Sequence, residues 1–186
     1  SLNLQGHVNR KNAFIVASAF ASTGIKDFAT LVGILNSFPS LSRRFEKIAD
    51  NIFTDYAHTP EKIRGALQIA HEIAGENVVV VYEGLHNTRQ HFIRDELAIM
   101  FEGAKKVYIV PSYLAREDTT LELLTPEKLS SLMLHPIDRE TAQLDEGLLK
   151  RIKDHALNGD LVLCLSAGSG NSLDEWLRHN FKQKNN

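Results

Sequence analysis

A run of four valines limits the possible folds of this chain more than any other feature. Residues Asn77 to Tyr82 read NVVVVY, and an unbroken β-branched run is typical of a strand covered on both faces of a parallel sheet. Further apolar strands are predicted over residues 106–110 (KVYIV) and 160–166 (DLVLCLS), with helical patterns between them. Strands that alternate with helices predict an α/β fold with a mostly parallel, doubly wound sheet flanked by helices.

The other elements are predicted from periodicity and from residues that begin or end helices. Residues 45–53 indicate a strand pair or one bent strand that ends at Asp55, and the closing KQKNN is expected to be frayed. The first helix carries apolar residues on most of its surface, which predicts that it is largely buried. Helices are predicted over residues 9–21 (ended by Gly24), 26–36 (ended by Phe38-Pro39), 59–74 (capped by Thr59, with Pro60 in its first turn and Gly75 at its end), 88–101, 125–133, 145–156 and 173–181.

Composition excludes several classes of function. A net charge of -2 over 186 residues gives no broad attraction to nucleic acid or anionic lipid. Cys164 is the single cysteine, which excludes an internal disulfide and a cysteine-cluster zinc site and suits a reducing compartment. Neither a stretch of the roughly 20 apolar residues that a membrane span requires nor a secretory signal is found, so a cytoplasmic location is expected.

In a sheet of this type, ligands bind beyond the carboxyl ends of the strands. The segment TDYAHTPE joins such a strand end to a helix start, where free N–H groups favour an anion. His58 is able to donate to a phosphate there, and Asp55 to accept from a sugar hydroxyl. The alternative is a structural role in which Thr59 caps the helix and Asp55 forms a turn.

Two further strand ends carry polar groups. After the valine run, YEGLHNTRQ places Arg89 near a helix start, where the helix dipole disfavours a cation; this favours a two-pronged contact with a carboxylate or phosphate. After residues 106–110, the segment PSYLARED contains Tyr113, Arg116 and Glu117. These three form either a pocket wall or a solvated loop.

The last strand end, SAGSGNS, is rich in glycine but lacks the third glycine of a dinucleotide-binding motif. No Gly-Lys pair occurs in the chain, so it has no GxxxxGK[ST] phosphate loop and should not by itself hydrolyse ATP by that route. HExxH and G-x-S-x-G patterns are also missing, which disfavours a metal site and a serine hydrolase.

Taken in order, the segments GHVNRKN, SRRFE, TDYAHTPEKI, YEGLHNTRQ, YLARE and SAGSGN resemble the carboxyl-terminal portion of the Mur ligases. The likeness covers nearly the whole chain, and within the family it points to the members that join L-alanine to UDP-N-acetylmuramate. It implies a Rossmann-like domain of an ATP-dependent, ADP-forming ligase of peptidoglycan synthesis that uses ATP and Mg²⁺. Residues 1–38 would be the last helices of the central ATPase domain, and residues 39–186 the amino-acid-binding domain.

The same resemblance implies roles for individual residues. Asn9 and Asn12 match two asparagines of a motif whose second asparagine contacts adenine, although Val8 replaces the usual histidine before them. Arg44 and Asp55 match residues that hold the ribose and phosphates, and His58 stands where the family places a polar group near the nucleotide.

Arg89 matches the arginine that grips the carboxylate of the incoming amino acid, and His86 and Tyr113 are predicted to line the same substrate site. Leu85 and His86 replace a His-Arg pair of the family motif, so the motif does not settle which amino acid is the substrate. By resemblance, the amine attacks an acyl phosphate formed on the sugar carboxyl, and Arg89 and His58 take part in catalysis. The alternatives are another Mur-type ligase, such as a murein tripeptide ligase or the diaminopimelate-adding enzyme, or a non-catalytic nucleotide-binding α/β module.

Overall fold

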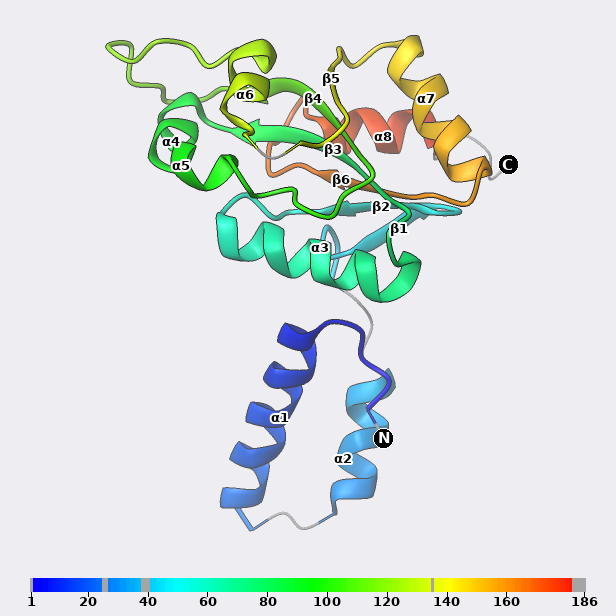
Figure 1. Ribbon diagram of the computed structural model, residues 1–186. Coiled ribbons are helices and arrows are strands. Elements are labelled where there is room, and N and C mark those ends of the chain that lie inside the picture. Colours follow the sequence, from blue (N-terminus) through cyan, green and yellow to red (C-terminus); the bar gives the residue numbers. More distant parts are fainter. Residues whose placement is uncertain (1, 25–26, 38–40, 135, 182–186) are drawn as a thin grey trace.

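The computed structural model describes residues 2–24, 27–37, 41–134 and 136–181. At its centre lies a six-stranded sheet in the order β1-β2-β6-β3-β4-β5 (Figure 1). Among the described residues, β1 is antiparallel to β2 and every other pair of neighbours is parallel, which confirms the predicted mostly parallel sheet. The strands are β1 (Glu46–Ala49), β2 (Ile52–Asp55), β3 (Val78–Leu85), β4 (Lys106–Tyr113), β5 (Arg139–Thr141) and β6 (Leu161–Leu165).

Helices cover both faces of the sheet, as the valine run predicts. Val80 and Tyr82 of β3 pack into a core with helices α3 (Pro60–Ala74), α5 (Arg94–Leu97) and α6 (Pro126–Leu132). Val79 and Val81 point to the opposite core, which helices α7 (Glu146–Leu157) and α8 (Leu173–Phe181) close. Because successive side chains of a strand alternate between faces, a strand inside two cores is apolar at nearly every position, and in β3 the buried Glu83 is the one charged residue. The doubly wound arrangement is therefore confirmed.

Helix α3 begins and ends where the sequence predicts, with Pro60 in its first turn and Gly75 at its carboxyl end with φ of 59°. The side chain of Thr59 makes no capping hydrogen bond, so the predicted side-chain cap is wrong. Instead the Thr59 carbonyl accepts the N–H of Ile63 at 2.9 Å. Pro60 has no N–H, so this helix start has one donor fewer to satisfy.

One predicted helix is corrected, and one strand was not predicted. The single helix expected over residues 88–101 is two short ones, α4 (Asn87–Phe92) and α5, separated at Ile93. The side chain of the buried Asn87, at the start of α4, bonds to a distant loop: it donates to the Glu122 carbonyl and accepts the N–H of Leu124. Strand β5 was not predicted, because its three half-buried residues show neither alternation nor an apolar run.

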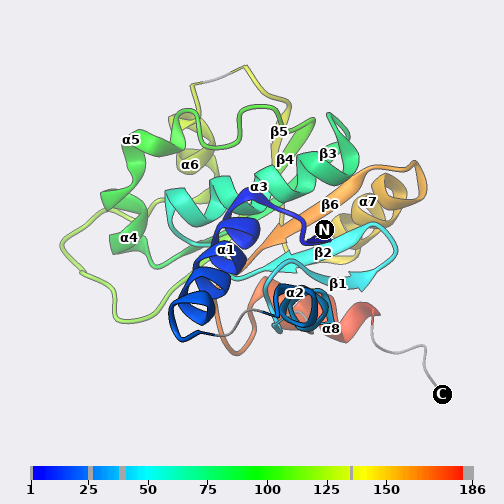
Figure 2. The ribbon, with the colours of Figure 1, turned by 90° about the horizontal axis from the view of Figure 1, so that it is seen from below.

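Helices α1 (His7–Ser22) and α2 (Phe28–Ser37) form a hairpin that extends away from the sheet beneath α3 (Figures 1 and 2). It is joined to α3 by Arg10, which pairs with Glu72 at 2.7 Å. Ala13 is the one buried residue of α1, while Phe14 is 69% exposed. The prediction of a largely buried helix is thus wrong for this chain, because nothing in the described residues packs on that face.

The predicted break at Phe38-Pro39 and the frayed KQKNN end lie outside the described residues. In the part of the chain that the structure describes, no helix has the length and apolarity to span a membrane.

Candidate active site

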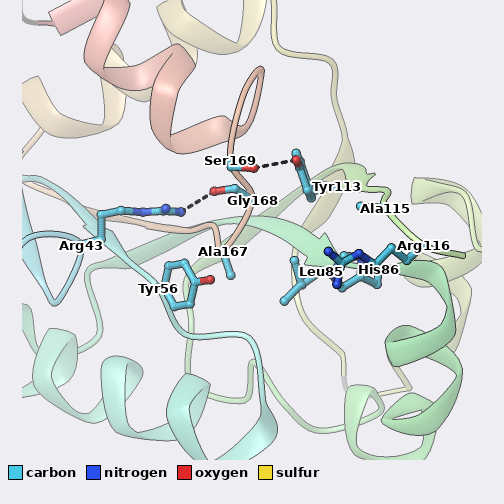
Figure 3. A pocket seen from close by; sticks show the side chains of 10 residues that line it. All are labelled: Arg43, Tyr56, Leu85, His86, Tyr113, Ala115, Arg116, Ala167, Gly168 and Ser169. Carbon is cyan, nitrogen blue, oxygen red and sulfur yellow. Dashed lines mark hydrogen bonds between the residues drawn. The ribbon is translucent and has the colours of Figure 1, made fainter.

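The carboxyl ends of β2, β3, β4 and β6 meet at one edge of the sheet, as parallel strands must. Beyond them lies a cavity of about 290 Å³ (Figure 3), lined by Arg43, Tyr56, Leu85, His86, Tyr113, Ala115, Arg116, Ala167, Gly168 and Ser169. A neighbouring groove of about 430 Å³ shares His86, Ala115 and Arg116 with the cavity and is completed by Thr88, Arg89, Phe92 and Ile93. The predicted substrate residues Arg89, His86 and Tyr113 are therefore brought to this one edge.

Asp55 lies at the end of β2 and is only 8% exposed. Its carboxylate accepts the N–H of Phe45 at 2.8 Å, which closes the turn that leads into β1. Burial raises the pKa of Asp55, while hydrogen bonds from the Phe45 and Ala57 N–H groups and the charges of Arg44 and Lys62 oppose the rise. Asp55 thus has a structural task, and its proximity to Arg44 and Lys62 leaves it facing a region of positive charge.

His58 lies at the start of α3 within the same positive region. Burial lowers the pKa of His58, the hydrogen bond to the Tyr56 carbonyl opposes this, and the charges of Lys62, Arg89 and Arg44 lower the pKa further. Its Nδ1 lies 2.8 Å from the Tyr56 carbonyl, which only accepts hydrogen bonds, so Nδ1 carries the proton and Nε2 of the neutral ring is an acceptor. Donation from Nε2 to a phosphate, as the sequence suggested, therefore requires a protonated ring.

Arg89 and His86 both line the groove, but of the two only His86 has a side-chain partner in the described chain. Among the described residues, the Arg89 guanidinium has no hydrogen-bond or ion-pair partner, whereas His86 Nδ1 lies 3.3 Å from Glu117 Oε1. Glu117 also accepts the N–H groups of Ala115 at 2.9 Å and Thr88 at 3.1 Å, so this carboxylate is firmly placed. Tyr113 and Arg116 therefore line the cavity, as the pocket-wall alternative predicts, while Arg116 also remains exposed to solvent.

Tyr113 closes the cavity against the glycine-rich loop after β6. Its hydroxyl lies 2.8 Å from Ser169 Oγ (Figure 3), and a Cβ placed on Gly168 would lie 2.5 Å from the tyrosine ring. A glycine is needed at position 168 because the ring occupies the space of any side chain. The carbonyl of Gly168 accepts a hydrogen bond from Arg43 at 2.8 Å, so the loop is held by its carbonyl oxygen.

The sequence did not single out the residues that hold this loop. Arg43 donates to the Ser166 and Gly168 carbonyls and stacks over Tyr56, with 4.5 Å from its guanidinium carbon to the ring centre. Glu83, 4% exposed, accepts the Ser166 hydroxyl at 2.6 Å and burial raises its pKa. One available signal was the acidic Glu83 directly after a run of buried apolar residues, because buried carboxylates need partners.

Asn9 and Asn12, predicted to hold the nucleotide, lie exposed on α1 and line neither the cavity nor the groove. Asn9 donates to the Gln5 carbonyl at 2.9 Å. The described residues contain no group of three His, Cys, Asp or Glu side chains that could hold a metal ion. No ligand for the expected Mg²⁺ is therefore assigned to this chain.

Comparison with known proteins identifies the family. Residues 43–168 match the family described as "Mur ligase, glutamate ligase domain". The chain belongs to the Mur ligase family. The matched residues include the whole of the cavity described above except Ser169, so the sheet edge is part of the family's own domain.

Within the Mur ligase family, the chain is similar to the UDP-N-acetylmuramate–L-alanine ligase of Gloeobacter violaceus, with 30% identity over 177 residues that cover 93% of this chain and 38% of that protein. The enzyme of the same name from Rickettsia typhi is 31% identical over 157 residues, covering 76% of this chain and 31% of its own. The chain thus spans well under half the length of these relatives.

Solved structures share the fold. The UDP-N-acetylmuramate-alanine ligase of Thermotoga maritima matches with a TM-score of 0.68 and 22% identity, over 98% of this chain and 39% of that one. The folylpolyglutamate synthase of Mycobacterium tuberculosis matches with a TM-score of 0.61 and 21% identity, over 90% and 39%. At these identities the likeness concerns the fold alone.

Proposed function

We propose that this chain is the carboxyl-terminal part of a longer ATP-dependent, ADP-forming ligase that joins L-alanine to UDP-N-acetylmuramate in the cytoplasm. Relatives with about 30% identity carry that name. The single observation that supports the proposal most is the guanidinium of Arg89, which lacks a partner in the described chain and lines a groove at the carboxyl edge of a parallel sheet. A free guanidinium in such a position is suited to a carboxylate.

In this proposal the chain orients the amino acid. Arg89 holds the carboxylate so that the amine is directed at the activated carboxyl carbon of the sugar, and orientation of this kind supplies much of the rate enhancement of two-substrate reactions. The neutral His58, beside Arg89 in the positive region, presents Nε2 as a hydrogen-bond acceptor. Closure of the domain over the other substrates would exclude water from the activated group.

ATP would supply the free energy for activating the carboxyl group. It would be held mainly by another domain, because this chain has no phosphate loop. Arg44 and Asp55 form the edge of this chain that would face the ribose and phosphates, and Asn9 and Asn12 on α1 would lie towards the adenine. We propose residues 1–38 as the last helices of the central domain and 39–186 as the third domain; the exposed apolar residues of α1 support this division.

The test is the Arg89→Ala variant of the full-length protein, with Arg94→Ala as the matched control. Arg94 is an exposed arginine of the next helix whose nearest acid, Asp95, lies 4.0 Å away. Loss of a charge-assisted pair should raise the amino-acid KM roughly 10- to 100-fold, with the KM for ATP unchanged. If neither turnover nor the amino-acid KM responds to Arg89→Ala, the proposed role is wrong.

A second candidate is a ligase of the same family with another amino acid. It is favoured by His86, whose imidazole pairs with Glu117 at the junction of cavity and groove, where the family motif has arginine. A panel of L-alanine, glycine, L-glutamate and diaminopimelate with the full-length protein would separate the candidates, because kcat/KM for the true substrate should exceed the others.

A further inference from the structure

We propose that Arg116 is a substrate-binding residue whose guanidinium, together with that of Arg89, holds the carboxylate of the incoming amino acid. The inference rests on the proposed function and adds a second anchor to it. Arg116 lines both the cavity and the groove, and Figure 3 shows it beside His86, on the side of the cavity opposite Arg43.

The backbone of Arg116 points to a functional role. Its φ is 57°, in the left-handed region that side chains rarely adopt, at a cost of about 1 kcal/mol or more for a residue other than glycine. Six non-glycine residues of the described chain have positive φ, and three of them, Arg43, His86 and Arg116, line this one cavity. Strained residues of this kind gather at ligand sites.

The strain at Arg116 is imposed by fixed neighbours on both sides. The N–H of Ala115 donates to Glu117 Oε1 at 2.9 Å, and the N–H of Asp118 donates to Thr88 Oγ1 at 3.1 Å. Glu117 itself is held by the Thr88 N–H at 3.1 Å. The turn is thereby tied to the start of α4, which positions residue 116 over the groove.

The charges around the groove are unbalanced. Glu117 is the acid nearest in sequence to Arg116, and its oxygens are already engaged by His86 and two backbone N–H groups. Arg116, which is exposed, and Arg89 both line the groove, and neither has an acidic partner among the described residues. An anion bound in the groove would give both guanidinium groups an acceptor.

The rest of the groove indicates what the anion is attached to. Phe92, which is 82% exposed, Ile93 and Ala115 supply an apolar surface beside the two cations. This combination fits a small molecule with a carboxylate and a short apolar body, such as L-alanine, better than the phosphates of a nucleotide.

The test is the Arg116→Gly variant of the full-length ligase, assayed with the amino acid and ATP varied in turn. Glycine removes the guanidinium and tolerates the positive φ, so the variant should unfold at a temperature no lower than the parent protein. The amino-acid KM should rise roughly 10- to 100-fold, as for the loss of one charge-assisted contact, with the ATP KM unchanged. Arg116→Lys should lie between, since lysine keeps the charge but loses the fork.

The outcomes separate this inference from the proposed function. If Arg89→Ala raises the amino-acid KM and Arg116→Gly does not, the second anchor is refuted and the proposed function stands. A rise in the ATP KM alone would make Arg116 a nucleotide contact and also refute the inference. A full-length protein that ligates no amino acid would refute both. Shared binding further requires that the double variant lose less than the product of the two single losses.

Discussion

The ion pair between Glu46 of β1 and Arg178 of α8 offers the sharpest stability test. Two hydrogen bonds join the groups, at 3.0 Å and 2.7 Å, and Glu46 also accepts the N–H of the strained Arg43 at 2.7 Å. Hydrogen bonds from Arg178 first, and then from the Arg43 N–H and the Ser42 hydroxyl, lower the pKa of Glu46 from 4.5 to about 2 against the opposing effect of burial. We expect Glu46→Gln to weaken the attachment of the last helix to the edge of the sheet.

The magnitude follows from that pKa. At about 1.4 kcal/mol for each pKa unit, a fall from 4.5 to about 2 corresponds to about 3 kcal/mol of unfolding free energy. The Glu46 side chain is 26% exposed, and Arg178 keeps its pair with Asp174 at 2.9 Å in the variant. Solvent screening and this remaining partner reduce the expected loss to about 2 kcal/mol at pH 7.

The sign of the pH dependence is fixed by the direction of the pKa change. A carboxyl group with a lowered pKa in the folded state stabilises the fold fully above its unfolded pKa of 4.5 and loses this contribution as the pH falls towards about 2. Urea unfolding of the parent and Glu46→Gln proteins at pH 7, 5, 4 and 3 should therefore show a difference that shrinks below pH 4.5. A difference as large at pH 3 as at pH 7 would refute the reasoning, as would a loss below about 0.5 kcal/mol at pH 7. Asp50→Asn, which breaks a pair whose acid is 97% exposed, is the control and should change little.

Two further predictions concern buried positions. Gly168→Ala should lower the unfolding temperature and displace Tyr113, because the added Cβ would lie 2.5 Å from the Tyr113 ring and 2.7 Å from Ser172 Cβ. Gly170→Ala, with open space at its Cβ, is the control in the same thermal scan. Equal unfolding temperatures for the two variants would count against this packing argument. Cys164 should resist a thiol reagent at pH 8 until urea unfolds the chain, because complete burial raises the pKa of its thiol; rapid labelling of the folded protein would show that the β6 core opens.

The strands were predictable where the local sequence alone indicates that a segment is buried. The valine run predicted β3 as an interior strand, because a short β-branched apolar run is typical of a strand covered on both faces. Strand β5 and the division at Ile93 were not predictable, since they depend on contacts with distant residues, such as the pairing of Val107 with Arg139. The exposure of α1 was mispredicted because apolar composition does not reveal whether a covering surface is present.

The candidate site was predictable in part for a similar reason. Arg89 and His86 follow a strand end, and the rule that parallel strands expose their carboxyl ends together places them at one edge. Arg43 could not be assigned, because its partners, the carbonyls of Ser166 and Gly168, lie more than 120 residues away. Whether Arg89, Arg44 and Asp55 contact substrates stays a prediction.

The place of β6 in the sheet has a consequence for synthesis of the protein. Of the described strands, β6 comes last in chain order, and it pairs with both β2 and β3 in the middle of the sheet. Until it emerges, β2 and β3 each present an open hydrogen-bonding edge beside apolar side chains, an arrangement that invites wrong pairing. The sheet therefore cannot be completed until residues 161–165 have been made.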